Sequence, residues 1–133
     1  MENLNKFLRK LLIKLLRLDE WHCSSHYDKE YARYTVKMIN NLMERDGKTN
    51  GQIIEIGCGL GDIIGYVKAK RNRKTGFDLE QKVAYAASIL HPDTKFRKGS
   101  FANIGNEEIY CLIMVNLLHF IDPDYTKGEI RKI

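Results

Sequence analysis

The alternation of apolar and polar positions predicts two helices in the first third of the chain. Residues 4–18 repeat apolar side chains at helical spacing, and about 100° per residue places one set on a single face: Leu4, Phe7, Leu8, Leu11, Leu12, Leu15 and Leu18. Ile13 falls outside this face. A second helical pattern covers residues 28–45, where Asp28 can cap the start, and turn-forming residues follow at 46–51.

Further along the chain, strand patterns alternate with helical ones. A run rich in β-branched residues predicts a strand at 52–56, and further short strands are predicted at 74–78, 94–98 and 110–116. Helical patterns follow the first strand, through Ile63, Ile64 and Val67, and cover residues 80–90, with another start at Asp122-Pro123. The run at 110–116 is nearly all apolar, which is typical of a strand buried on both faces. This order predicts an α/β, Rossmann-like parallel sheet with helices on both faces, preceded by N-terminal helices.

Length and composition narrow the class of protein. A chain of 133 residues fits one domain, and its 44% hydrophobic content allows a packed core. No apolar run is long enough to cross a bilayer. The three cysteines have no CxxC spacing, which fits neither a disulfide framework nor a zinc site and favours a reducing cytoplasm. The first 18 residues lack a signal-peptide cleavage site, so we do not expect export.

Positive charge is concentrated at the start of the chain. Five of the basic residues behind the net charge of +5 lie within residues 1–18, against one acidic residue, Glu2. The predicted helix at 4–18 therefore either docks on its own domain or contacts a partner or the inner face of an anionic membrane. A second basic run at 68–74 has no interleaved aromatic residues, so no nucleic-acid partner is expected.

A glycine turn follows the first predicted strand, in the sequence Glu55-Ile56-Gly57-Cys58-Gly59-Leu60-Gly61. Glycines at such a turn let a ligand approach the backbone closely. Asp78 ends the next predicted strand, where a carboxylate can accept both ribose hydroxyls. The spacing differs from the G-x-G-x-x-G of dinucleotide sites, which disfavours a nicotinamide cofactor. The pattern predicts a nucleoside ligand without pyrophosphate, and nothing calls for a metal.

Three segments resemble the class I S-adenosylmethionine-dependent methyltransferases: EIGCGLGDII at 55–64, TGFDLEQKVAYAA at 75–87 and LIMVNLLHFI at 112–121. The resemblance implies S-adenosyl-L-methionine as cofactor. It assigns to the cofactor site the glycine turn, the ribose-binding acid with its neighbour, the adenine segment and the end of the fourth strand: Glu55, Gly57, Cys58, Gly59, Gly61, Asp78, Leu79, Ser100, Phe101 and Asn116. Cys58 would stand at a helix N-terminus, which favours a thiolate, although no redox role is expected.

The segment before the glycine turn also has a relative. Trp21-His22, followed by Tyr31-Ala32, is similar to a bacterial subgroup often encoded beside surface-polysaccharide genes. This similarity implies methyl transfer to a hydroxyl of a small molecule or glycan. His119 is the candidate catalytic base, or else a histidine packed on the following helix. A lid or acceptor role is the hypothesis for Trp21, His22, His26 and Tyr27, and the alternative is that they hold the first helix or loop backbone.

The resemblance also implies a sheet of seven strands in the order 3-2-1-4-5-7-6, of which this sequence supplies the first four. We therefore expect residues 1–18 to form a basic amphipathic helix and 19–133 a partial methyltransferase domain truncated after strand four, with 19–51 as lid and N-terminal helix. The edge of strand four would be open to a second copy or a complementing chain. The alternative to an active enzyme is a weak or inactive cofactor-binding remnant, or half of a split enzyme.

Overall fold

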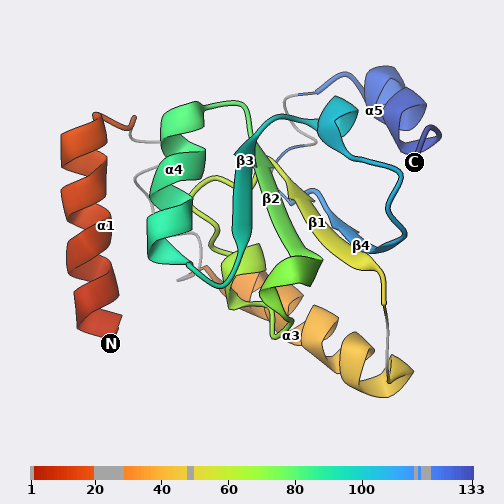
Figure 1. Ribbon diagram of the computed structural model, residues 1–133, viewed down its shortest axis with the longest axis horizontal. Coiled ribbons are helices and arrows are strands. Elements are labelled where there is room, and N and C mark those ends of the chain that lie inside the picture. The colour runs from red at the N-terminus through yellow and green to blue at the C-terminus, as the bar shows by residue number, and fades with distance from the viewer. Residues whose placement is uncertain (1, 20–28, 48–49, 116, 118–120) are drawn as a thin grey trace.

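The computed structural model describes residues 2–19, 29–47, 50–115, 117 and 121–133. Its helices are α1 (Glu2–Leu16), α3 (Glu30–Asp46), α4 (Gln81–Leu90) and α5 (Pro123–Ile130), with short 3-10 turns η1 (Ile64–Tyr66), η2 (Arg71–Arg73) and η3 (Phe101–Asn103). The strands are β1 (Gln52–Ile56), β2 (Lys74–Asp78), β3 (Lys95–Lys98) and β4 (Ile109–Ile113). They pair in parallel in the order β3-β2-β1-β4, which confirms the predicted α/β sheet (Figure 1).

The two central strands, β1 and β2, lie in the hydrophobic core because their residues point into apolar layers on both faces of the sheet. On one face Ile53 packs with η1 and with the buried side of α3, including Val36 and Ile39. On the other face Ile54 and Ile56 pack with Phe77 and Phe101. Parallel pairing brings the carboxyl ends of β1 and β2 together, since Ile56 lies opposite Phe77. The residues that follow each strand, Gly57 and Asp78, therefore meet at one edge.

The prediction that the fourth strand is buried on both faces is wrong. Of the residues in β4 only Ile113 is buried, and the others are half-buried. The cause is the position of β4 at the edge of the described sheet, where β1 is its one strand neighbour among the described residues. A central position would have covered both faces and both backbone edges.

The α-helix predicted after the glycine turn is also absent from the described structure: turns lead into η1 instead. The Ile64 N–H donates to the buried Glu55 carboxyl at 3.1 Å, so it is not available to a helical i−4 carbonyl. Tyr66 then bonds to the Ile63 carbonyl, three residues back. The basic run at 68–74 ends inside the protein, because Lys74 begins β2, is fully buried, and donates to Asp93 and to the Val67 carbonyl.

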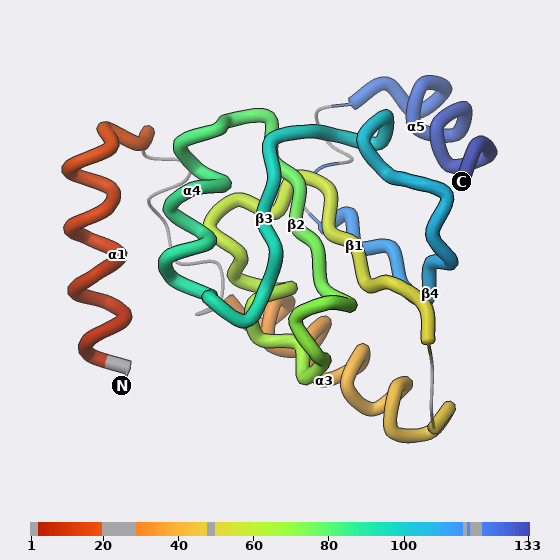
Figure 2. Tube along the Cα trace, in the orientation of Figure 1, coloured from red at the N-terminus to blue at the C-terminus, as the bar shows by residue number. Residues whose placement is uncertain are grey.

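The helix α1 docks on its own domain, alongside α4 and away from the sheet (Figure 2). Leu12 is buried there with Leu60, Val83 and Leu90, and Ile13 packs against the same cluster. The docking face is thus rotated relative to the seven-residue face predicted from sequence, because it includes Ile13 and leaves four apolar residues exposed: Leu4, Phe7, Leu11 and Leu15. Among the described helices none is long and apolar enough to span a membrane.

We expect Gly65→Ala to destabilise the protein, because Gly65 packs directly against a buried histidine ring. A β-carbon at Gly65 would lie 2.5 Å from the Nδ1 atom of His91, whose ring is in edge contact with Tyr66. Overpacking of this kind costs about 1–3 kcal/mol of unfolding free energy, which urea titration measures. Gly128→Ala is the matched control, since nothing lies within 4 Å of its added carbon, and it should leave stability unchanged or gain up to about 1 kcal/mol. Equal stabilities of the two variants would contradict the packing.

Candidate functional site

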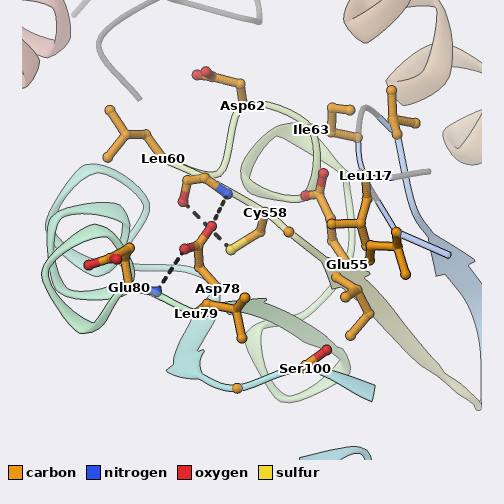
Figure 3. Close-up of a pocket in the computed structure, with 16 residues that line it drawn as sticks. Glu55, Cys58, Leu60, Asp62, Ile63, Asp78, Leu79, Glu80, Ser100 and Leu117 are labelled. Carbon is orange, nitrogen blue, oxygen red and sulfur yellow. Dashed lines mark hydrogen bonds between the residues drawn. The ribbon is translucent and has the colours of Figure 1, made fainter. Parts of the chain in front are cut away.

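A cavity of about 340 Å³ lies at the carboxyl ends of β1 and β2 (Figure 3). This is the edge where open parallel sheets bind their ligands, and the volume falls in the range of small-molecule pockets. Seven of the residues assigned to the cofactor site from sequence line it: Glu55, Gly57, Cys58, Gly59, Asp78, Leu79 and Ser100. The structure therefore brings together residues from the glycine turn, the end of β2 and the loop after β3.

The glycine turn is held by β2 and leaves its centre open. Gly57, Gly59 and Gly61 have φ angles of 70°, 53° and 81°, which side chains with a β-carbon rarely adopt. The N–H groups of Gly57 and Cys58 both donate to the Phe77 carbonyl, at 2.8 and 3.0 Å. At Gly59 no atom lies within 4 Å of the place a β-carbon would take. A ligand can therefore lie directly against the backbone at Gly59.

Asp78 connects three loops around the cavity and is 7% exposed. One carboxylate oxygen accepts the Gly59 N–H at 3.0 Å and the other accepts the Glu80 N–H at 3.0 Å (Figure 3). The backbone carbonyl of Asp78 accepts the Gly99 N–H at 2.8 Å. Each carboxylate oxygen keeps a further lone pair, so the group can still accept hydrogen bonds from two hydroxyls of a ligand.

Glu55 is a buried carboxyl group at the inner wall of the cavity. Burial raises its pKa to about 8; the N–H of Ile64 opposes this shift, and the negative charges of Asp62 and Asp78 add to it. Glu55 is therefore mostly protonated at neutral pH when no cation is near. A positively charged ligand would favour its ionised form and draw the proton off.

Cys58 is buried beside the same carboxyl groups. Burial raises the pKa of its thiol well above the usual value, and the charges of Glu55 and Asp78 raise it further. The expected thiolate at a helix N-terminus is wrong, because the described segment after Cys58 forms turns and η1 rather than an α-helix. The thiol lies 3.6 Å from the Gly59 carbonyl and donates to it weakly, which fits a structural role.

Asp62 belongs to the cavity wall and is tied to α1. Its two carboxylate oxygens accept from Nη1 and Nη2 of Arg9, at 2.7 and 2.9 Å. The side chains of both residues are largely buried, with 13% of Arg9 and 6% of Asp62 exposed. The docked helix thus reaches the cavity through one bidentate ion pair, 53 residues away in sequence.

The wall of the cavity is acidic, and Asp78 and Glu80 give it most of its negative charge, because Glu55 is mostly protonated and Asp62 is paired with Arg9. Four acidic residues contribute to its wall, namely Glu55, Asp62, Asp78 and Glu80. Among the described lining residues there is no Lys, Arg or His. Such a wall attracts cationic ligands and repels phosphates, since a pyrophosphate needs donors or positive charge nearby. The cavity is therefore better suited to a ligand that carries positive charge than to one that carries phosphate.

Some predicted site residues lie elsewhere. Gly61 faces the rings of Phe96 and His91, and Phe101 is buried in the core with Ile54, Ile56 and Phe77. Neither Gly61 nor Phe101 lines the cavity. The candidates Asn116, His119, Trp21, His22, His26 and Tyr27 lie outside the described residues.

Sequence reasoning missed nine of the sixteen described residues in the cavity wall: Ile56, Leu60, Asp62, Ile63, Glu80, Gly99, Val115, Leu117 and Ile121. Asp62 and Glu80 lie within two of the segments that carry the resemblance, at 55–64 and 75–87, so their positions in these segments could have indicated them as site residues. The apolar residues 115, 117 and 121 follow β4, and no pattern separates them from ordinary core residues.

Solved structures show which proteins share this fold. No family model and no curated protein matches the sequence. Magnesium protoporphyrin IX methyltransferase from Synechocystis, solved with S-adenosylmethionine, matches over 75% of this chain and 51% of its own, at 15% identity and a TM-score of 0.58. An S-adenosylmethionine-dependent methyltransferase of putative assignment from Methanococcus maripaludis matches over 92% of this chain and 57% of its own, at 18% identity and a TM-score of 0.52. The chain has the fold of the S-adenosylmethionine-dependent methyltransferases.

A third neighbour agrees with this fold assignment. The TehB-like S-adenosylmethionine-dependent methyltransferase of Corynebacterium glutamicum matches at 20% identity and a TM-score of 0.50, over 68% of this chain and 51% of its own. The chain spans about half the length of the solved structures it matches. These findings confirm the fold expected from the resemblance, whereas the bacterial subgroup and the truncation stay predictions.

Proposed function

We propose that this chain binds S-adenosyl-L-methionine in the acidic cavity and takes part in methyl transfer to a hydroxyl of a small molecule or glycan. The observation that carries the proposal is the acidic cavity on the glycine turn, at the carboxyl ends of β1 and β2 in a methyltransferase fold. The two described free cysteines, Cys58 and Cys111, support the proposal of a reducing, cytoplasmic location.

The cavity fits this cofactor chemically at three points. The open backbone at Gly59 offers room for the amino-acid part, and the spare lone pairs of Asp78 suit the two ribose hydroxyls. Ser100, which lines the cavity beside Leu79, is proposed to contact the adenine. The carboxyl groups, Glu55 foremost, offset the positive charge of a sulfonium and an ammonium group.

The chain's own residues would chiefly orient and deprotonate the acceptor. The cofactor supplies an already activated methyl group, whose transfer to an acceptor oxygen leaves a thioether. The acceptor hydroxyl must lose its proton as the new O–C bond forms, and we propose His119 as the base that takes it. Leu117 and Ile121, which flank His119 in sequence, line the cavity. His119→Ala is expected to abolish transfer while cofactor affinity changes little.

Calorimetric titration with S-adenosylhomocysteine tests the proposal. We expect binding to the 133-residue chain with a stoichiometry of one, competed by S-adenosylmethionine and not by NADH, because the acidic wall repels a pyrophosphate. Binding of NADH in preference to S-adenosylhomocysteine would replace this proposal with a nicotinamide site. The absence of binding by a folded chain would contradict a complete cofactor site within these residues.

Cofactor affinity is expected to rise with pH between about 6 and 8. In the empty cavity Glu55 has a pKa of about 8, so it must release its proton when a cationic ligand lowers that pKa. Binding is then coupled to proton release, which calorimetry in two buffers of different ionisation enthalpy detects. Glu55→Gln should flatten the pH dependence and abolish the proton release. If the affinity of the wild-type protein does not change between about pH 6 and 8, the role of Glu55 is contradicted.

The second candidate is a cofactor-binding unit that another chain completes across β4, as a homodimer or with a complementing partner. This candidate is favoured by the position of β4, whose residues are mostly half-buried and which pairs with β1 alone among the described strands, so that its other edge is open to another chain. Sedimentation velocity over a range of concentrations tests it. If cofactor affinity rises as the chain self-associates, a second copy completes the site; a monomer of constant affinity would contradict the homodimer.

A further inference from the structure

The side of α1 that faces away from the domain carries a continuous apolar row. Four side chains form this row, called here the α1 ridge, and are 68, 65, 41 and 69% exposed: Leu4, Phe7, Leu11 and Leu15. At about 100° per residue they fall within a sector about 80° wide. The other side of α1 is fixed to the domain by the cluster around Leu12 and by the Arg9–Asp62 ion pair, so this row faces outward.

Positive charge lies along one flank of the α1 ridge. Lys10 and Lys14 are exposed and occupy the helical positions next to Phe7 and Leu11 on the side away from α4. The opposite flank, with Leu8 and Leu12, packs toward the domain. An apolar row bordered by long cationic side chains is the pattern of a helix that lies in the plane of a membrane surface, with lysines reaching the lipid phosphates.

We propose that the α1 ridge binds the surface of an anionic lipid bilayer. The apolar row enters the boundary between headgroups and acyl chains, while Lys10 and Lys14 contact lipid phosphates. A second copy fits the ridge less well, because the open flank of each ridge carries lysines and the other flank is closed by α4. The proposal does not depend on methyl transfer, since the ridge lies on the face of α1 away from Asp62 and the cavity.

Vesicle co-sedimentation of the whole chain tests this surface. We expect binding to vesicles that contain phosphatidylglycerol and little binding to pure phosphatidylcholine, with the difference reduced at high salt. Lys10→Gln with Lys14→Gln should weaken binding roughly 25-fold, at about fivefold for each lysine near the surface. Phe7→Ser with Leu11→Ser should weaken it by at least about 20-fold through lost apolar burial.

Two matched controls distinguish binding by the α1 ridge from nonspecific binding to vesicles. Tyr34→Ser with Met38→Ser removes exposed apolar area from α3, and Lys68→Gln with Lys70→Gln removes exposed positive charge elsewhere. Neither should change vesicle binding by more than about twofold, and circular dichroism should show all four variants folded. Equal binding to both kinds of vesicle, no binding, or equal losses in the controls would overturn the proposal. If the chain binds no vesicles and sedimentation velocity shows a dimer that only the Phe7→Ser, Leu11→Ser variant dissociates, the ridge binds a second copy and the proposal is overturned.

Discussion

Replacing Asp78 with Asn is expected to weaken S-adenosylhomocysteine binding by about 100-fold, the largest effect of any single change in the cavity. The side chain holds the turn at Gly59 and the backbone of Glu80 through one carboxylate oxygen each. An amide keeps one acceptor oxygen but turns N–H groups toward one of those donors. It also loses the negative charge that strengthens bonds to ligand hydroxyls, and two charge-assisted hydrogen bonds account for a loss of this size.

Glu80→Gln is the matched control for Asp78→Asn. It removes a carboxylate from the same cavity wall, but its backbone N–H still donates to Asp78 and its side chain is exposed. Calorimetry should show a change of no more than about threefold in affinity. Thermal unfolding of both variants shows whether the turn itself survives. A folded Asp78→Asn variant that binds as tightly as the wild type would remove Asp78 from the site.

The parallel sheet and the core of the site were predictable because they depend on local patterns. The short strand patterns at 52–56 and 74–78 and the glycine turn between them indicated β1, β2 and the meeting of Gly57 with Asp78. The structure places both residues in one cavity wall. Both β1 and β2 end where their patterns end, at Ile56 and Asp78, and parallel pairing then fixes which ends meet.

The errors arose where a distant partner decides the local structure. The Ile64 N–H donates to the buried Glu55 carboxyl, and no residue near Ile64 in the sequence indicates this bond. The apolar spacing at 63–67 therefore predicts a helix that the structure does not form. Likewise the sequence of the basic run at 68–74 does not show that Lys74 is buried, because its partners, Asp93 and the Val67 carbonyl, lie outside the run. The docking face of α1 differs from the predicted apolar face for the same reason, because Arg9 turns toward the domain and pairs with Asp62 instead of facing water.

Replacing Arg9 with Met is expected to destabilise the protein by about 3–5 kcal/mol, because the largely buried Asp62 then loses its bidentate bonds to the Arg9 guanidinium. A loss of this size lowers the midpoint of thermal unfolding by roughly 10 °C or more in a chain of this length. Since Asp62 lines the cavity and Arg9 does not, we also expect weaker S-adenosylhomocysteine binding, measured well below the unfolding temperature.

The double variant, Arg9→Met with Asp62→Leu, separates the ion pair from simple packing. Removing both charges leaves no buried group uncompensated, so most of the lost stability should return, and a double-mutant cycle measures the coupling. Lys127→Met is the surface control: its partner is Asp124, both side chains are largely exposed, and the change should stay within about 0.5 kcal/mol. If Arg9→Met costs no more than this control, α1 is held by its apolar cluster alone. If stability returns in the double variant while cofactor binding does not, the Asp62 carboxylate acts on the ligand directly, and Arg9 serves to position it.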